Sequence, residues 1–211
     1  MSFLILFIGA PGCGKGTQAS YLSKILNLPK ICMGDLVRDR LKANSSSMNE
    51  GRLINDDVIN TFFLDELIKI EDKESVILDG YPRTIDQAFF LEKIKKNRKI
   101  IVFYFKVDYD VLFKRISGRF NCVDCGFIYN DYFKPTAVKG VCDSCGSSSM
   151  NFRSDDQEKV LVNRLLEYDN LTKPILEYYN KFGVVEEINS NQDIAEVSSY
   201  TLKLYNGLIS L

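Results

Sequence analysis

The sequence contains no histidine among its 211 residues. This absence excludes nucleophilic catalysis by Ser-His or Cys-His pairs, proton transfer through imidazole, and every metal site that needs a histidine ligand. Any chemistry must therefore depend on carboxylates, lysine, arginine or backbone groups.

An excess of charge of one sign is also lacking, because 27 Lys and Arg residues face 28 Asp and Glu residues. The formal net charge of −1 argues against a broad basic surface of the kind that binds DNA or RNA. We therefore expect no nucleic-acid partner, and any strong anion site must be local.

Long hydrophobic runs are absent as well. The first ten residues, MSFLILFIGA, are too few to span a bilayer, carry no basic leader and run into a turn, so we interpret them as a buried strand. We expect no membrane association and a cytoplasmic location. In a reducing cytoplasm, closely spaced pairs among the six cysteines indicate metal binding more than disulfides.

Helix and strand periods alternate along most of the chain, which predicts one α/β domain with a doubly wound parallel sheet and two inserts. Expected strands cover Phe3–Ile8, Lys30–Cys32, Val76–Leu78, Ile100–Phe105 and Val184–Ile188. Expected helices cover Lys15–Leu26, Asp35–Lys42, Asp56–Ile70, Thr84–Lys95, Tyr109–Ile116, Ser154–Tyr179 and Ile194–Leu208. Ser154 and Gln157 have capping-box spacing at the start of the long helix, and Pro174 should kink it.

A glycine-rich segment, GAPGCGKGT at residues 9–17, follows the first expected strand and matches G-x-x-x-x-G-K. Such a loop directs backbone N–H groups at phosphates, and the helix that follows adds its positive end. Lys15 would then neutralise the β- and γ-phosphates. A glycine turn without a ligand is the weaker alternative. A Cys-x₅-Arg phosphatase loop is excluded, because the sixth residue after Cys13 is Ala19.

The Mg²⁺ ligand of this motif is in doubt. The residue after the lysine is normally Ser or Thr, whereas this chain has Gly16 there and Thr17 one place later. Asp79, at the end of an expected strand, is the carboxylate that we expect to compensate, acting through metal-bound water.

Four cysteines form a second motif, in which Cys122-x₂-Cys125 and Cys142-x₂-Cys145 are separated by 16 residues. This spacing predicts a closed tetrathiolate Zn²⁺ site with a structural role. Two disulfides or four unligated thiols are the weaker alternatives. A nucleic-acid-binding zinc ribbon is disfavoured, because Asp124, Asp131 and Asp143 outnumber the lysines of the segment.

Several arginines flank these two motifs. Arg83 follows the expected strand that ends at Asp79, Arg115 and Arg119 precede the cysteine segment, and Arg153 and Arg164 follow it. Fixed guanidinium groups can stabilise the charge that develops during phosphoryl transfer without any protein proton carrier.

Taken together, these motifs resemble the adenylate kinase family in its bacterial form with a zinc-binding lid. The matching segments are GAPGCGKGTQA at residues 9–19, MGDLVR at 33–38, LDGYPRT at 78–84 with Gln87, KRISGR at 114–119, and FRSDDQ with Arg164. The resemblance implies a P-loop core with a parallel five-stranded sheet and two mobile inserted subdomains. It also implies the reaction MgATP + AMP ⇌ 2 ADP, with Mg²⁺ and a structural Zn²⁺ as cofactors.

By this resemblance the core comprises residues 1–32, 58–118 and 154–211, the monophosphate-binding insert 33–57 and the lid 119–153. The ATP-contacting positions are Gly12, Cys13, Gly14, Lys15, Gly16, Thr17, Arg119, Ile128, Tyr129 and Gln192. The AMP-contacting positions are Met33, Arg38, Arg52, Leu53, Ile54, Gly80, Tyr81, Pro82, Arg83, Gln87, Arg153 and Arg164. The positions expected to act in catalysis are Lys15, Asp79, Arg83, Arg115, Arg119, Arg153 and Arg164. We expect a monomer.

One departure from the family pattern bears on the substrate. Met33 stands where the family usually has a threonine that helps to fix AMP, which leaves a UMP/CMP kinase as an alternative, whereas Gln87 favours adenine. A binding module that closes on ATP without transferring phosphate is a third possibility, and the second cluster of arginines argues against it.

Overall fold

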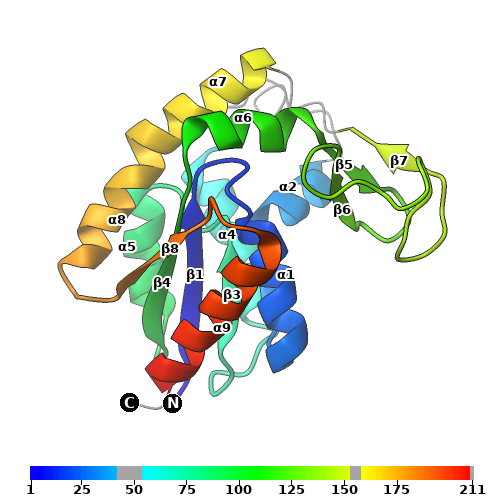
Figure 1. Ribbon diagram of the computed structural model, residues 1–211. Coiled ribbons are helices and arrows are strands. Elements are labelled where there is room, and N and C mark those ends of the chain that lie inside the picture. Colours follow the sequence, from blue (N-terminus) through cyan, green and yellow to red (C-terminus); the bar gives the residue numbers. More distant parts are fainter. Residues whose placement is uncertain (42–53, 153–157, 210–211) are drawn as a thin grey trace.

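The computed structural model describes residues 1–41, 54–152 and 158–209, and its centre is a five-stranded parallel sheet in the order β2-β3-β1-β4-β8 (Figure 1). The strands are β1 (Phe3–Gly9), β2 (Lys30–Cys32), β3 (Val76–Asp79), β4 (Lys99–Lys106) and β8 (Val185–Asn189). All five strands that the sequence predicts are therefore present, and the doubly wound α/β fold is confirmed.

The two faces of the sheet are covered by different helices, because β1 is apolar on both sides. Phe3, Ile5 and Phe7 belong to one hydrophobic cluster, and the alternating residues between them belong to the other. The helices of the first cluster are α1 (Lys15–Leu26), α6 (Tyr109–Ser117), α7 (Glu158–Glu167) and α9 (Ile194–Ile209). Those of the second are α2 (Met33–Leu41), α4 (Asp56–Leu67), α5 (Ile85–Ile94) and α8 (Lys173–Asn180).

The long helix expected between Ser154 and Tyr179 is divided. A π-helical turn at Tyr168–Thr172 separates α7 from α8, and Pro174 lies in the first turn of α8. The interruption expected at the proline therefore lies just before it, because proline is tolerated in a first helical turn but not further inside. The capping pair Ser154 and Gln157 lies outside the described residues.

The cysteine segment forms a small antiparallel sheet that projects from the core (Figure 1). Its strands are β5 (Arg119–Cys122), β6 (Ile128–Asn130) and β7 (Met150–Asn151), in the order β6-β5-β7. The sequence did not predict these strands, since each is too short to show a period of two. The buried interior of this sheet contains Phe120, Cys122, Tyr129 and Cys142.

No helix within the described ranges has both the length and the apolar character needed to cross a bilayer.

Arg98 anchors the loop that leads into β3. This loop lies at the amino ends of the parallel strands, and the glycine-rich segment lies at their carboxyl ends. Arg98 is 2% exposed, and its guanidinium donates hydrogen bonds to the carbonyl oxygens of Ile70, Glu71 and Glu74, at 2.8 to 3.3 Å. Replacing it leaves several carbonyl groups of this loop without their donor.

We therefore expect Arg98→Met to lower the free energy of unfolding by about 2–3 kcal/mol, the scale of a lost hydrogen bond to a charged group. Urea denaturation followed by circular dichroism measures this change. The neighbouring Lys99 is exposed, so Lys99→Met should change stability by less than about 0.5 kcal/mol. Equal effects of the two substitutions would contradict the anchoring role.

Candidate functional site

A large cleft runs along the carboxyl ends of the parallel strands, where open α/β sheets bind their ligands. Its volume is about 1210 Å³, above the roughly 300–1,000 Å³ that is usual for a small-molecule site. The walls come from the glycine-rich loop, α2, the segment after β3, the small cysteine-containing sheet, α7 and the turn after β8. The cleft is thus large enough for two nucleotides.

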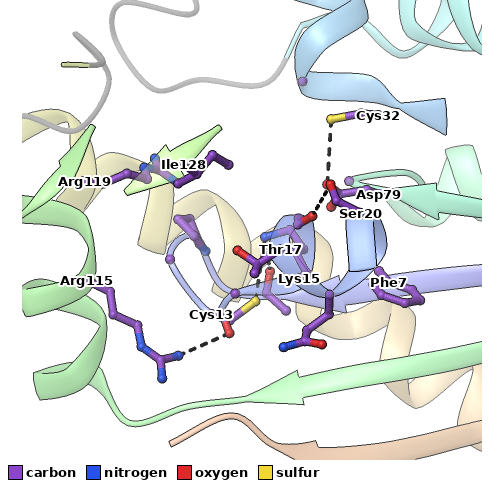
Figure 2. A pocket seen from close by; sticks show the side chains of 18 of the residues that line it. Phe7, Cys13, Lys15, Thr17, Ser20, Cys32, Asp79, Arg115, Arg119 and Ile128 are labelled. Atoms are coloured by element: carbon purple, nitrogen blue, oxygen red, sulfur yellow. Dashed lines mark hydrogen bonds between the residues drawn. The ribbon is translucent and has the colours of Figure 1, made fainter. Parts of the chain in front are cut away.

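The glycine-rich loop joins β1 to α1 at the floor of this cleft (Figure 2). Gly12 and Gly14 have φ angles of +82° and +94°, and a Cβ on Gly12 would lie 2.6 Å from the Ile116 side chain. Only glycine fits both requirements at residue 12. The loop leads into the N-terminus of α1, whose N-cap residue is Gly14. Because no side chain caps the first N–H groups there, they can bind an anion.

Lys15 lies at the first position of α1 and folds back over the loop. Its Nζ donates to the carbonyl oxygens of Gly9, at 3.1 Å, and Ala10, at 3.2 Å. These bonds hold one positive charge beside the backbone donors of the loop. The arrangement suits a phosphate chain that needs both a cation and N–H groups.

Asp79 ends β3 and lies next to the start of α1. A Cβ built on Gly16 would lie 3.1 Å from Asp79 Oδ2, and the thiol of Cys32 donates to the same oxygen at 3.7 Å (Figure 2). Burial, together with the charge of Asp79, raises the pKa of Cys32 to about 12. Cys32 is therefore a neutral donor, and Asp79 is oriented without a second negative charge. Mg²⁺ bound with a nucleotide fits this oxygen-rich place beside Gly16 and Thr17.

The segment after β3 forms the other half of the cleft. Arg83 Nε donates to Gly80 O at 2.9 Å, and the carbonyl of Arg83 accepts from Thr172 of the π-helical turn at 2.9 Å. Arg38, from α2, forms an ion pair with Asp35 at the cleft wall. Two guanidinium groups from different elements are therefore fixed in this half.

Tyr81 was expected to contact AMP, but its side chain is not part of the cleft wall. Its side chain is 1% exposed and does not line the cleft, since it stacks on Phe63 with ring centroids 4.1 Å apart and donates to Asn60 at 2.7 Å. Its neighbours Gly80 and Pro82 do line the cleft. The aromatic ring of Tyr81 thus belongs to the core and supports the segment from below.

Arg115 connects three parts of the cleft half that contains the glycine-rich loop. Its guanidinium donates to Cys13 O at 3.4 Å (Figure 2). It also donates to Gln192 O at 3.3 Å and lies 5.6 Å from the centroid of the Phe133 ring. Desolvation lowers the pKa of this guanidinium. Arg115 therefore sits between the glycine-rich loop and the turn after β8, and the cation–π contact ties it to the cysteine-containing sheet.

The structure places most of the expected nucleotide-contacting residues on this one cleft. They are Gly12, Cys13, Gly14, Lys15, Gly16, Thr17, Met33, Arg38, Ile54, Asp79, Gly80, Pro82, Arg83, Gln87, Arg115, Arg119, Ile128, Tyr129, Arg164 and Gln192. Arg52, Leu53 and Arg153 lie outside the described residues.

Sequence reasoning missed Asp35, Cys32 and Phe133, which pair with residues that it did identify. It also missed Asp56, which accepts a hydrogen bond from the side-chain amide of Gln87. The Thr84-x-x-Gln87 spacing is a capping-box pattern and could have indicated that this amide makes further hydrogen bonds.

The four cysteine sulfur atoms of the small sheet lie within 4.8 Å of one another. Two of the Sγ–Sγ distances are 3.6 Å, from Cys122 to Cys145, and 3.5 Å, from Cys125 to Cys142. A tetrahedral Zn²⁺ with bonds of about 2.3 Å separates its sulfur ligands by about 3.8 Å, whereas a disulfide needs about 2.05 Å. The donor set and its spacing therefore fit a structural Zn²⁺, and the four cysteines are not paired as disulfides.

The phenol of Tyr129 connects this cluster to the cleft. Its Oη lies 3.3 Å from Cys142 Sγ and accepts a hydrogen bond from the backbone N–H of Asp143 at 2.7 Å. Burial raises the pKa of Cys142, but hydrogen bonds from Tyr129 and from the N–H groups of Cys145 and Ser144 outweigh this and bring it to about 6. The Cys142 sulfur is thus readily a thiolate, which is the form that binds Zn²⁺.

We expect Cys142→Ser to lower the bound zinc and the thermal stability, because a structural site contributes its binding free energy to folding. Metal analysis and thermal unfolding measure both quantities. Ser144→Ala is the matched control, since Ser144 is exposed in the same knuckle and its side chain is not a ligand in the cluster. Unchanged zinc content and melting temperature in Cys142→Ser would contradict the structural site.

Comparison with known proteins agrees with this geometry. Residues 7–184 match the family model described as "Adenylate kinase". The adenylate kinase of Rickettsia africae (strain ESF-5) is 39% identical over 201 residues, covering 92% of this chain and 94% of the relative. That of Rickettsia typhi (strain ATCC VR-144 / Wilmington) is 35% identical over 208 residues, covering 95% and 98%. A glycine-rich loop, a second arginine-lined half and a four-cysteine sheet thus occur in a chain that belongs to the adenylate kinase family.

Proposed function

We propose that the chain catalyses reversible phosphoryl transfer from MgATP to AMP, giving two ADP. The observation that carries this proposal is the division of one cleft into two halves, with the glycine-rich loop in one and Arg38, Arg83 and Gln87 in the other. Arg119 and Arg164 also line the same cleft. Phosphate groups entering from both halves would meet among these cations.

The reaction proceeds by positioning and charge stabilisation. Backbone N–H groups of the loop and Lys15 hold the phosphates of the donor, while Arg83 and Arg38 hold the phosphate of the acceptor. Guanidinium groups fixed by protein carbonyls need little reorganisation when negative charge develops on the transferring oxygens. Mg²⁺ supplies additional charge when bound with ATP, and Asp79 would hold it beside Gly16.

The small sheet is proposed to act as a lid on the donor half. Arg119, Ile128, Tyr129 and Phe133 of this sheet and its turn line the cleft, and β5 follows directly after α6. Closing the lid over ATP would exclude water from a phosphate held by arginines and so prevent hydrolysis. The family resemblance implies a second mobile subdomain at residues 33–57, of which the structure describes 33–41 and 54–57.

We further propose that the chain acts as a monomer in the cytoplasm, with ATP, AMP and ADP as its ligands. Both halves of the cleft are built from one chain, so the site needs no second subunit. The aspartates of the lid, Asp124, Asp131 and Asp143, would repel a nucleic-acid backbone.

Met33 gives a specific reason to consider a second acceptor. It is 2% exposed, packs with the apolar residues of the second cluster and lines the cleft, and it offers no hydroxyl to an acceptor. A UMP/CMP kinase is therefore the alternative activity for the same fold.

A coupled assay with AMP, CMP, UMP and GMP decides between the two activities. We expect AMP to give the highest kcat/KM, because the Gln87 amide can pair with the amino edge of adenine. Equal or faster turnover of CMP or UMP would overturn the adenine assignment. Tight binding of ATP without formation of ADP from ATP and AMP would overturn the enzymatic function.

We expect Arg83→Ala to lower kcat/KM for AMP by at least about 10²-fold, the scale of losing one preorganised charge contact. Arg119→Ala should have an effect of the same size. Arg40→Ala is the control, because Arg40 pairs with Asp65 and Glu66 on the exposed surface and does not line the cleft. Near-normal activity of Arg83→Ala in the steady-state assay would refute the role of this residue.

A further inference from the structure

The side-chain amide of Gln87 is held by the protein from two sides. Its Nε2 donates to Asp56 Oδ1 at 2.6 Å, and its Oε1 accepts from the backbone N–H of Arg83 at 2.7 Å. Gln87 is 2% exposed and lines the cleft. The amide that we propose to contact the base of the acceptor nucleotide therefore already makes two hydrogen bonds within the protein.

These two partners determine which way the amide points. A carboxylate only accepts hydrogen bonds and a backbone N–H only donates them. Rotating the Gln87 amide by half a turn would bring Oε1 against Asp56 Oδ1 and Nε2 against the Arg83 N–H. Both contacts would then be repulsive, so one orientation is strongly favoured.

Asp56 is itself fixed from two helices. It lies in the first turn of α4, and its second oxygen, Oδ2, accepts from Thr84 Oγ1 at 2.6 Å. Thr84 caps α5, where its hydroxyl oxygen accepts from the Gln87 backbone N–H at 3.1 Å. The carboxylate thus bridges the N-termini of two helices and cannot rotate away from the amide without losing the Thr84 bond.

We infer that Asp56 is a specificity-positioning residue, which holds the Gln87 amide so that the acceptor half prefers a base with an amino group over a base with an oxo group at the same position. This inference rests on the proposed function, and it adds a residue that does not itself line the cleft. With one N–H and one oxygen lone pair engaged, the amide offers one N–H and one lone pair in a fixed order.

The order of these groups decides which base they match. Adenine presents a ring-nitrogen acceptor beside an amino donor, and a glutamine amide pairs with both. An oxo purine presents a carbonyl acceptor in place of the amino group, so a fixed amide oxygen would meet a second oxygen. A freely rotating amide could reverse its donor and acceptor and would discriminate much less.

AMP and IMP are the substrate pair that isolates this effect, because they differ only at this edge of the purine. In Asp56→Asn the side chain keeps its shape but can also donate, so the energy gap between the two amide orientations shrinks. We expect the ratio of kcat/KM for AMP to that for IMP to fall by about tenfold, as one charge-assisted hydrogen bond is weakened. The change should lie in KM for the monophosphate, with KM for ATP unaltered.

Asp57→Asn is the matched control, since it removes the same charge from the neighbouring position, which is exposed in the same helical turn. It should keep the wild-type AMP-to-IMP ratio. A purely structural role of Asp56 would lower activity with both nucleotides equally and leave the ratio unchanged, and that result overturns the inference. If Asp56→Asn is unfolded at the assay temperature, Asp56→Glu keeps the charge but displaces the carboxylate, and an unchanged ratio in this folded variant overturns it too.

The same assay separates this inference from the proposed function. Wild-type protein that forms no ADP from ATP and AMP refutes the function itself. Wild-type protein that is active on AMP, with an unchanged ratio in Asp56→Asn, refutes only the role of Asp56.

Discussion

The parallel pairing of β1 with β3 and β4 is the constraint on which the cleft depends. In this register Phe7 lies opposite Asp79 on one side and Phe103 on the other, so the glycine-rich loop and the Asp79–Arg83 segment leave the sheet at the same edge. Apolar residues on both faces of β1 fix that register, because the strand cannot slide without exposing them. Core packing therefore brings together groups that are about 70 residues apart in the chain.

The proposed mechanism relies on fixed cations, since the chain has no histidine. Lys15, Arg83 and Arg115 each bond to backbone carbonyl oxygens, which orient a positive charge without neutralising it. An ion pair with a carboxylate, as between Arg38 and Asp35, fixes the group but reduces its net charge. Bonds to carbonyl oxygens orient these cations in advance, which is the preorganisation that stabilisation of developing negative charge requires.

The sequence predicts those parts of the molecule whose signals are local. The five strands of the parallel sheet, the glycine-rich loop and the cysteine knuckles each depend on a short period or a fixed spacing, and each is present. The burial of Tyr81 beneath the cleft could not be predicted, because it depends on stacking against Phe63 of α4. The hydrogen bond from Gln87 to Asp56 could not be predicted for the same reason. It joins residues 31 positions apart and depends on the packing of α4 against α5.

The π-helical turn at Tyr168–Thr172 joins two helices that serve opposite faces of the sheet. Leu161 and Leu165 of α7 pack in one cluster, whereas Ile175 of α8 packs in the other. Each helical residue advances the azimuth by about 100°, so losing one residue from the turn would rotate α7 by that angle relative to α8. Arg164 would then turn away from the cleft wall, and Leu161 and Leu165 would leave their cluster. The length of this turn therefore sets the position of Arg164 in the adjoining helix.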